Sequence, residues 1–237
     1  MNVGLILIAL AVGWIGGGLV NWAADILPQS QSMTRTDFSL IWRARAHFWV
    51  LPWYWRGRMC PHCGEKRSAR YPVVMGVCIS LSLVMALRWG WGSSLIIAWL
   101  YGWFVMTVTV IDFEHHRVLN IMLAPAAAVV AAFSLLPTTP SLLATMLGGG
   151  VGFVVFLVLA IIGRGALGMG DVKLAGLIGM MIGYPGVLTA LIIGALLGGV
   201  AALLLLISRK ATRKTAIAYA PYLAFGALIT MWTMYGA

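Results

Sequence analysis

Long runs of apolar residues separated by short polar stretches dominate the sequence. The runs cover 3–27, 73–87, 94–111, 118–136, 142–162, 174–182, 187–207 and 216–235. A helix rises about 1.5 Å per residue, so roughly 20 apolar residues cross the hydrocarbon core of a bilayer. The run 174–182 is too short to cross alone and needs flanking residues to do so. The pattern predicts an all-α, polytopic membrane protein with about eight transmembrane helices.

The composition excludes a soluble enzyme and a disordered chain. Of the 237 residues, 62% are hydrophobic and 9% are charged, whereas soluble domains carry roughly 25% charged residues. Three cysteines are too few for a secreted disulfide framework. The first run begins without basic residues, which argues against a cleaved signal peptide.

Basic residues predict the orientation of these helices. If the polar stretch 28–72 is cytoplasmic, 15 of the 16 Lys and Arg residues lie on the cytoplasmic side, and Arg88 is the exception. This asymmetry agrees with the positive-inside rule and predicts an inner-membrane protein with both termini outside. The sixth run must cross, because otherwise the basic cluster 209–214 would lie outside. The net charge of +10 is therefore a topology signal, with attraction to anionic lipid as a second effect. No separate basic module points to nucleic acid.

Two of the six acidic residues lie at the ends of apolar runs that should meet on the cytoplasmic side. Asp112 closes the third run, and Asp171 follows the fifth, 59 residues later. Ionisable groups at membrane depth are costly and usually functional. Two adjacent carboxylates share a proton, so one can activate water while the other donates to a peptide carbonyl. Glu114 lies about 200° round a helix from Asp112 and should not face the same site.

Other interpretations of these acids stay open. Asp171 begins a predicted helix and is also suited to be its N-cap, with Gly168 and Gly170 forming the turn. Asp112 is also compatible with a solvated helix end beside Arg117. Membrane carboxylates serve proton-coupled transporters too, although the broken helices and repeats of such proteins are not evident. If the pair is catalytic, the two glycines leave room for an extended substrate beside Asp171.

Several motifs run in order along the chain. They are Gly17-Gly18-Leu19-Val20-Asn21, Cys60-Pro61-His62-Cys63 with Arg70-Tyr71-Pro72, Ile111-Asp112-Phe113 with Leu119-Asn120, Gly168-Met169-Gly170-Asp171-Val172-Lys173-Leu174-Ala175, and Tyr219-Ala220-Pro221-Tyr222-Leu223. Together they resemble the prepilin peptidases, membrane aspartic proteases of the Gly-x-Gly-Asp type that process type IV pilins and type II secretion pseudopilins.

The resemblance implies that Asp112 and Asp171 are the catalytic pair, with Gly168, Gly170 and Lys173 as substrate-binding residues. It implies a prepilin or pseudopilin substrate whose basic leader stays in the cytoplasm while its apolar helix lies in the bilayer. Cleavage then follows a glycine at that junction, without a cofactor. The expected domains are a first transmembrane helix at 1–27, a cytoplasmic loop at 28–72 and a peptidase core at 73–237.

The chain departs from the family pattern in the cysteine loop. Larger family members carry two Cys-x-x-Cys pairs that suggest a zinc site, whereas this chain has only Cys60 and Cys63. Zinc at this pair would need further ligands, such as His47, His62 or a second subunit. Many family members also methylate the new N-terminus with S-adenosylmethionine, but no site for that cofactor is recognisable here. The sequence leaves the oligomeric state open.

A thiol–disulfide oxidoreductase is the main competing prediction. Cys60 and Cys63 have the spacing of a redox dithiol. The predicted topology places them in the cytoplasm, where such pairs stay reduced, and no βαβ pattern lies nearby. Such an enzyme would lose activity in Cys60→Ser and keep it in Asp171→Asn, which is the opposite of the peptidase prediction.

Overall fold

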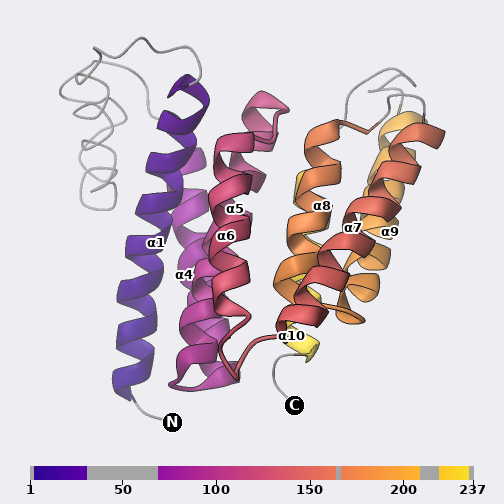
Figure 1. Cartoon of the computed structure of the whole chain (residues 1–237). Coiled ribbons are helices and arrows are strands. Elements are labelled where there is room, and N and C mark those ends of the chain that lie inside the picture. The colour runs from indigo at the N-terminus through magenta and orange to yellow at the C-terminus, as the bar shows by residue number, and fades with distance from the viewer. Residues whose placement is uncertain (1–2, 31–68, 164–166, 209–218, 235–237) are drawn as a thin grey trace. The chain divides into compact units, whose positions relative to one another are not determined.

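The computed structural model describes residues 3–30, 69–163, 167–208 and 219–234. All regular structure in these ranges is helical (Figure 1). The helices are α1 (Val3–Ser30), α4 (Arg70–Trp89), α5 (Ser93–His115), α6 (Asn120–Phe133), α7 (Leu142–Ile162), α8 (Met169–Ile182), α9 (Gly186–Ile207) and α10 (Ala220–Met234). Each lies where the sequence has an apolar run, which confirms the all-α membrane class.

Five of the described helices are long and apolar enough to cross a membrane, namely α1, α4, α5, α7 and α9. The other three are shorter, with 14 residues in α6, 14 in α8 and 15 in α10. These lengths fall below the roughly 20 residues that a perpendicular span needs. The chain is a polytopic membrane protein, and the count of eight crossings stays a prediction. Most of the predicted cytoplasmic loop lies outside the described residues.

The chain divides into two compact units, Met1–Thr107 and Val108–Ala237, and the boundary falls within α5. In the first unit α1 and α4 lie side by side (Figure 1). Small residues allow this approach: a Cβ atom added at Gly13 would lie 2.7 Å from the Cα atom of Ile79. One added at Gly17 would lie 2.7 Å from the sulfur of Met75. Glycines at helix contacts are typical of membrane bundles.

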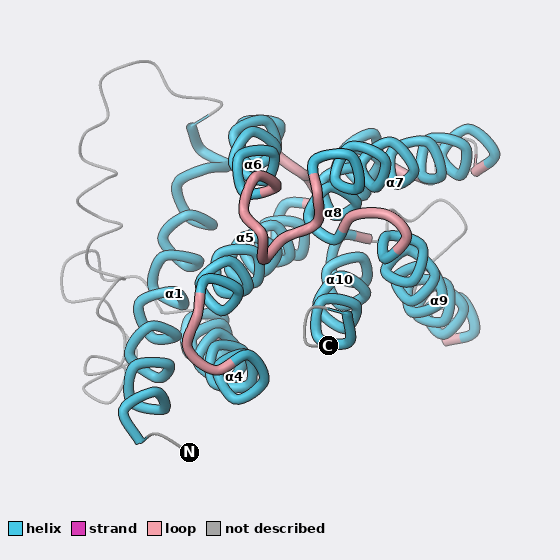
Figure 2. The backbone as a smooth tube through the Cα atoms, turned by 60° about the horizontal axis from the view of Figure 1, so that its bottom comes forward, coloured by secondary structure: helices cyan, strands magenta, loops and turns pink. Residues whose placement is uncertain are grey.

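The second unit surrounds α8 with α6, α7, α9 and α10 (Figure 2). Nine of the 14 residues of α8 are buried. Its contact with α7 is a backbone-to-backbone one, because a Cβ atom added at Gly148 would lie 2.2 Å from the carbonyl oxygen of Gly179. One added at Gly152 would lie 2.3 Å from the carbonyl oxygen of Ala175. This packing fixes the start of α8, where Asp171 lies.

Candidate active site

Asp112 lies in the last turn of α5 and is only 4% exposed. The next two residues, Phe113 and Glu114, are exposed, so Glu114 points away from Asp112 as the helical period predicts. The helix ends at His115, and His116 adopts a left-handed conformation with φ of 50°. The chain then turns into α6. This arrangement directs one acid inward and leaves the following residues at the surface.

A backbone amide from a distant helix contacts Asp112. The N–H of Ala220, the first residue of α10, donates to Oδ2 of Asp112 over 3.1 Å. The bond is buried and joins residues 108 positions apart in the chain. A buried carboxylate needs such donors, because a charge without hydrogen bonds is costly away from water. No sequence pattern predicted this contact.

Asp171 lies in the first turn of α8, which is not among the helices long enough to span a membrane. Its Oδ2 accepts a hydrogen bond from the N–H of Gly168 over 3.3 Å. The N-cap position belongs to Gly168, and Asp171 is the third residue inside the helix. The prediction of Asp171 as the N-cap residue was therefore wrong by three positions. The side chain still caps the helix, by reaching back to the preceding turn.

The two acids interact electrostatically. The pKa of Asp171 is raised from its ordinary value of 3.8 to about 6, first by burial and second by the negative charge of Asp112. The Gly168 hydrogen bond opposes this rise. Two carboxylates that repel each other in this way hold one proton more tightly than either would alone. The described chain thus brings α5 and α8 together at a pair of acids suited to share a proton.

The three predicted substrate-binding residues differ in what surrounds them. A Cβ atom added at Gly170 would lie 2.9 Å from Cβ of Val118, so this glycine is needed for close packing against the turn before α6. At Gly168 the nearest atom would be 3.5 Å away, an ordinary contact. Lys173 is exposed, and its Nζ donates to Oδ1 of Asn120 over 2.9 Å. Substrate binding by these residues stays a prediction.

Residues 99–203, which include both acids, match the sequence model of the type IV leader peptidase family. Over this segment the chain is similar to the type IV leader peptidases. This confirms the resemblance seen in the motifs. The prepilin leader peptidase/N-methyltransferase of Aeromonas hydrophila is 28% identical over 189 residues, which are 77% of this chain and 64% of that protein. The protein of the same name from Bacillus subtilis (strain 168) is 26% identical over 180 residues, 76% of this chain and 73% of that protein.

The chain matches only part of the length of the curated leader peptidases. A third relative, the prepilin leader peptidase/N-methyltransferase of Pseudomonas putida, is 28% identical over 186 residues. The chain spans 63% of that protein and 64% of the Aeromonas hydrophila protein. No solved structure matches the chain. The similarity therefore covers about two thirds of these relatives and supports a peptidase.

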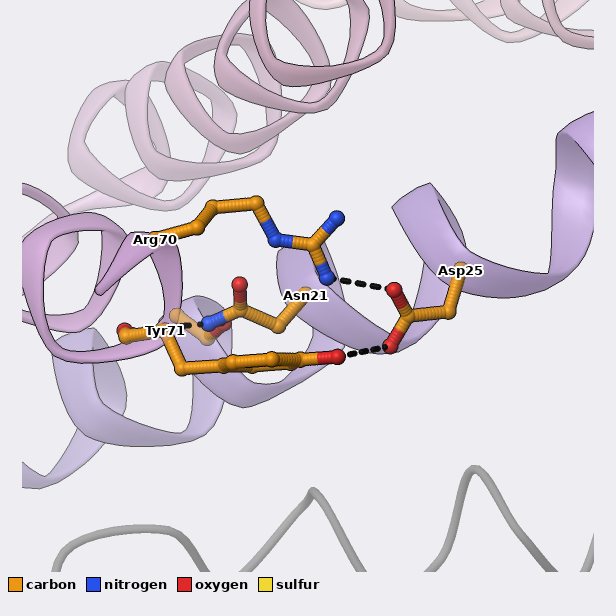
Figure 3. Close-up of polar contacts among 5 residues, drawn as sticks. Asn21, Asp25, Arg70 and Tyr71 are labelled. Atoms are coloured by element: carbon orange, nitrogen blue, oxygen red, sulfur yellow. Dashed lines mark hydrogen bonds and ion pairs between the residues drawn. The ribbon is translucent and has the colours of Figure 1, made fainter. Parts of the chain in front are cut away.

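A second polar cluster joins α1 to α4 in the first unit of the chain (Figure 3). Arg70 forms an ion pair with Asp25, and the hydroxyl of Tyr71 donates to Oδ2 of Asp25 over 3.0 Å. Nδ2 of Asn21 donates to the carbonyl oxygen of Tyr71 over 3.3 Å and to that of Gly17 over 3.1 Å. These bonds explain why the contact between α1 and α4 tolerates polar residues, since each polar side chain has a partner on the other helix.

No sequence pattern predicted this cluster. A signal existed, because Asn21 and Asp25 are four positions apart and so lie on one face of α1. The motif containing Arg70 and Tyr71 was also known to match the family pattern. Neither observation alone says that the two motifs touch.

No group of three or more metal-binding side chains occurs within the ranges that the structure describes. Cys60 and Cys63, together with His47 and His62, lie outside those ranges, so zinc at this loop stays a prediction. Cys78, the third cysteine, is buried in α4 and is not in a disulfide.

Proposed function

We propose that this chain is a membrane aspartic endopeptidase that removes the basic leader from type IV prepilins or type II secretion pseudopilins. The observation that carries the proposal is the electrostatic coupling of Asp112 and Asp171. Both acids lie inside the segment that matches the type IV leader peptidase family. The similar proteins are named prepilin leader peptidases, which supports a prepilin as the substrate class.

The reaction that we propose begins with one proton on the pair. The ionised carboxylate takes a proton from water as the water oxygen attacks the peptide carbonyl carbon, and the protonated carboxyl gives its proton to the carbonyl oxygen. One hydroxyl of the resulting gem-diol returns a proton to the carboxylate that had protonated the carbonyl oxygen. The carboxyl that took its proton from water then protonates the peptide nitrogen while the carbon–nitrogen bond breaks. These two transfers restore the starting protonation of the pair. The cycle uses no cofactor.

The predicted topology suits this substrate class. With the loop at 28–72 in the cytoplasm of an inner-membrane protein, both acids lie near the cytoplasmic boundary. A prepilin presents its leader and the start of its apolar helix at the same depth. The bilayer anchors that helix, so the enzyme needs to hold only the short junction that is cut, after a glycine. S-adenosylmethionine enters the proposal only if the chain also methylates the new N-terminus, and zinc only as a structural ion at Cys60 and Cys63.

The test is coexpression of the chain with a prepilin, followed by measurement of leader removal as a gel shift. Asp112→Asn and Asp171→Asn are each expected to lower processing by at least about 10³-fold, since each removes one half of the acid–base pair. Glu114→Gln is the matched control, because it neutralises an exposed acid two residues from Asp112. It is expected to keep normal processing.

Membrane fractionation would establish that all variants insert in equal amounts. Normal processing by either asparagine variant would contradict the proposed mechanism. Loss of processing in Cys60→Ser together with activity in Asp171→Asn would instead favour the oxidoreductase. Mass spectrometry of the product's N-terminus would show whether a methyl group is added.

A further inference from the structure

The start of α10 contributes a backbone donor to the acid pair. Ala220 is the first residue of the helix and is 0% exposed. The first N–H groups of a helix have no acceptor within their own helix, and the helix dipole favours negative charge at this end. Here the N–H of Ala220 meets that need by donating to Asp112, which is itself buried. The contact therefore suits the ionised form of Asp112.

Aromatic packing holds this amide in position. The ring of Tyr219 lies with its centroid 5.8 Å from that of Phe156 in α7. Its hydroxyl donates to the carbonyl oxygen of Gly194 in α9 over 3.5 Å. A Cβ atom added at Gly198, also in α9, would lie 2.4 Å from the Tyr219 ring. Contacts from two other helices thus fix the residue that precedes Ala220, and the amide cannot move freely relative to Asp112.

We propose that the first turn of α10 is a third part of the active site, in which the Ala220 N–H orients Asp112 as the ionised base and leaves Asp171 as the proton donor. The proposal rests on the proposed function and deepens it. A peptide N–H can only donate, and a hydrogen bond to a charged acceptor is stronger than one to a neutral acceptor. Because the bond engages Oδ2, we assign Oδ1 of Asp112 to the attacking water.

Asp171 has a weaker arrangement for holding a charge. Its backbone donor is Gly168, at 3.3 Å, compared with 3.1 Å between Ala220 and Asp112. The Gly168 bond is exposed, whereas the Ala220 bond is buried. Water competes with an exposed bond, while burial strengthens one electrostatically. The shared proton is therefore expected to reside on Asp171. Ala220 contacts Asp112, which the proposal makes the base, and is given no contact with the substrate. Its role is therefore that of a positioning residue.

The test removes the Ala220 N–H without changing any side chain. Incorporation of lactic acid at position 220 by nonsense suppression changes the amide to an ester and keeps the shape of the chain. The matched control is leucic acid at position 223, which removes the N–H that Leu223 donates to the carbonyl oxygen of Tyr219, the residue before the helix. Alanine reinserted at position 220 by the same method is the reference.

The expected result is a fall in kcat for prepilin cleavage of about 10- to 100-fold in the position-220 ester, the range expected for loss of one charge-assisted hydrogen bond. KM should stay within about threefold, because the amide does not touch the substrate. The position-223 ester should keep kcat within about threefold. A purely structural role for this turn would lower activity similarly in both esters, through a smaller folded fraction, and that result would overturn the proposal.

A genetically simpler variant gives a second measurement. Ala220→Pro also removes the N–H, and proline suits the first position of a helix. Ala220→Gly keeps the N–H and is its control. Equal kcat values for the position-220 ester and the alanine reference would overturn the inference while the proposed function stands. If the alanine reference itself failed to cleave any prepilin, that result would instead contradict the proposed function.

Discussion

At the scale of single residues, Asp171 is held in surroundings that disfavour its charge. The folded chain raises the pKa of this carboxyl from 3.8 to about 6, mainly through burial. The folded state therefore binds the proton more tightly than the unfolded state, and stability falls as the pH rises from about 4 to about 6. One pKa unit corresponds to about 1.4 kcal/mol, so the ionised side chain costs at most about 3 kcal/mol. Such a cost is a common trade of stability for function at catalytic positions, which is the role that we propose for Asp171.

We therefore predict that Asp171→Asn is inactive and yet more stable than the unmodified chain at pH 8. Asparagine keeps the size of the side chain and loses the unfavourable charge. The difference in apparent melting temperature should shrink as the pH falls towards 3, because the acid is then mostly protonated in both the folded and the unfolded state. The fluorescence of the 11 tryptophans of detergent-purified protein measures it. A variant that is less stable at pH 8 would show that the charge of Asp171 is better compensated than the geometry indicates.

At the scale of elements, the contact between α7 and α8 positions Asp171. Gly148 lies so close to α8 that an added Cβ atom would lie 2.2 Å from the carbonyl oxygen of Gly179, a rigid backbone atom. Gly150 is in the same helix, and nothing lies within 4 Å of its added Cβ atom. The two glycines therefore offer a matched pair of substitutions with opposite expected outcomes.

We predict that Gly148→Ala forces the helices apart, destabilises the protein by roughly 1–3 kcal/mol and lowers prepilin processing. Gly150→Ala should be neutral or stabilising by up to about 1 kcal/mol, because alanine favours helices. Melting temperature and gel shift on the same preparations check both results. Equal behaviour of the two variants would mean that the tight contact between α7 and α8 does not hold Asp171 in place.

At the scale of the whole molecule, the helices were predictable and several contacts between them were not. Apolar runs bounded by polar stretches mark the helices directly, and helix sidedness was enough to suggest that Asp112 and Asp171 meet. The Ala220 contact could not be predicted, because every residue except proline has a backbone N–H and none is distinctive in sequence. The pairing of Asp25 with Arg70 depends on the packing of α1 against α4, which no local pattern encodes.

The predicted orientation of the chain rests on charge alone and can be tested through α5, whose two ends should lie on opposite sides of the membrane. Trp91 precedes this helix and is 70% exposed, and Glu114 lies in its last turn and is also exposed. In a chain with Cys60, Cys63 and Cys78 replaced by serine, we predict that Trp91→Cys reacts with an impermeant maleimide in intact spheroplasts. Glu114→Cys should react only after the membrane is permeabilised. Leader removal by the cysteine-free chain is the control for folding.

The reverse labelling would place the acid pair on the outer side, away from the cytoplasmic leader of a prepilin. That outcome would contradict the proposed substrate even if both acids were essential. Labelling of both positions in intact cells would mean that α5 does not cross the membrane, although its 23 residues are long and apolar enough to do so. Because the expected pattern requires a single crossing between the two cysteines, it tests the positive-inside argument independently of any catalytic assay.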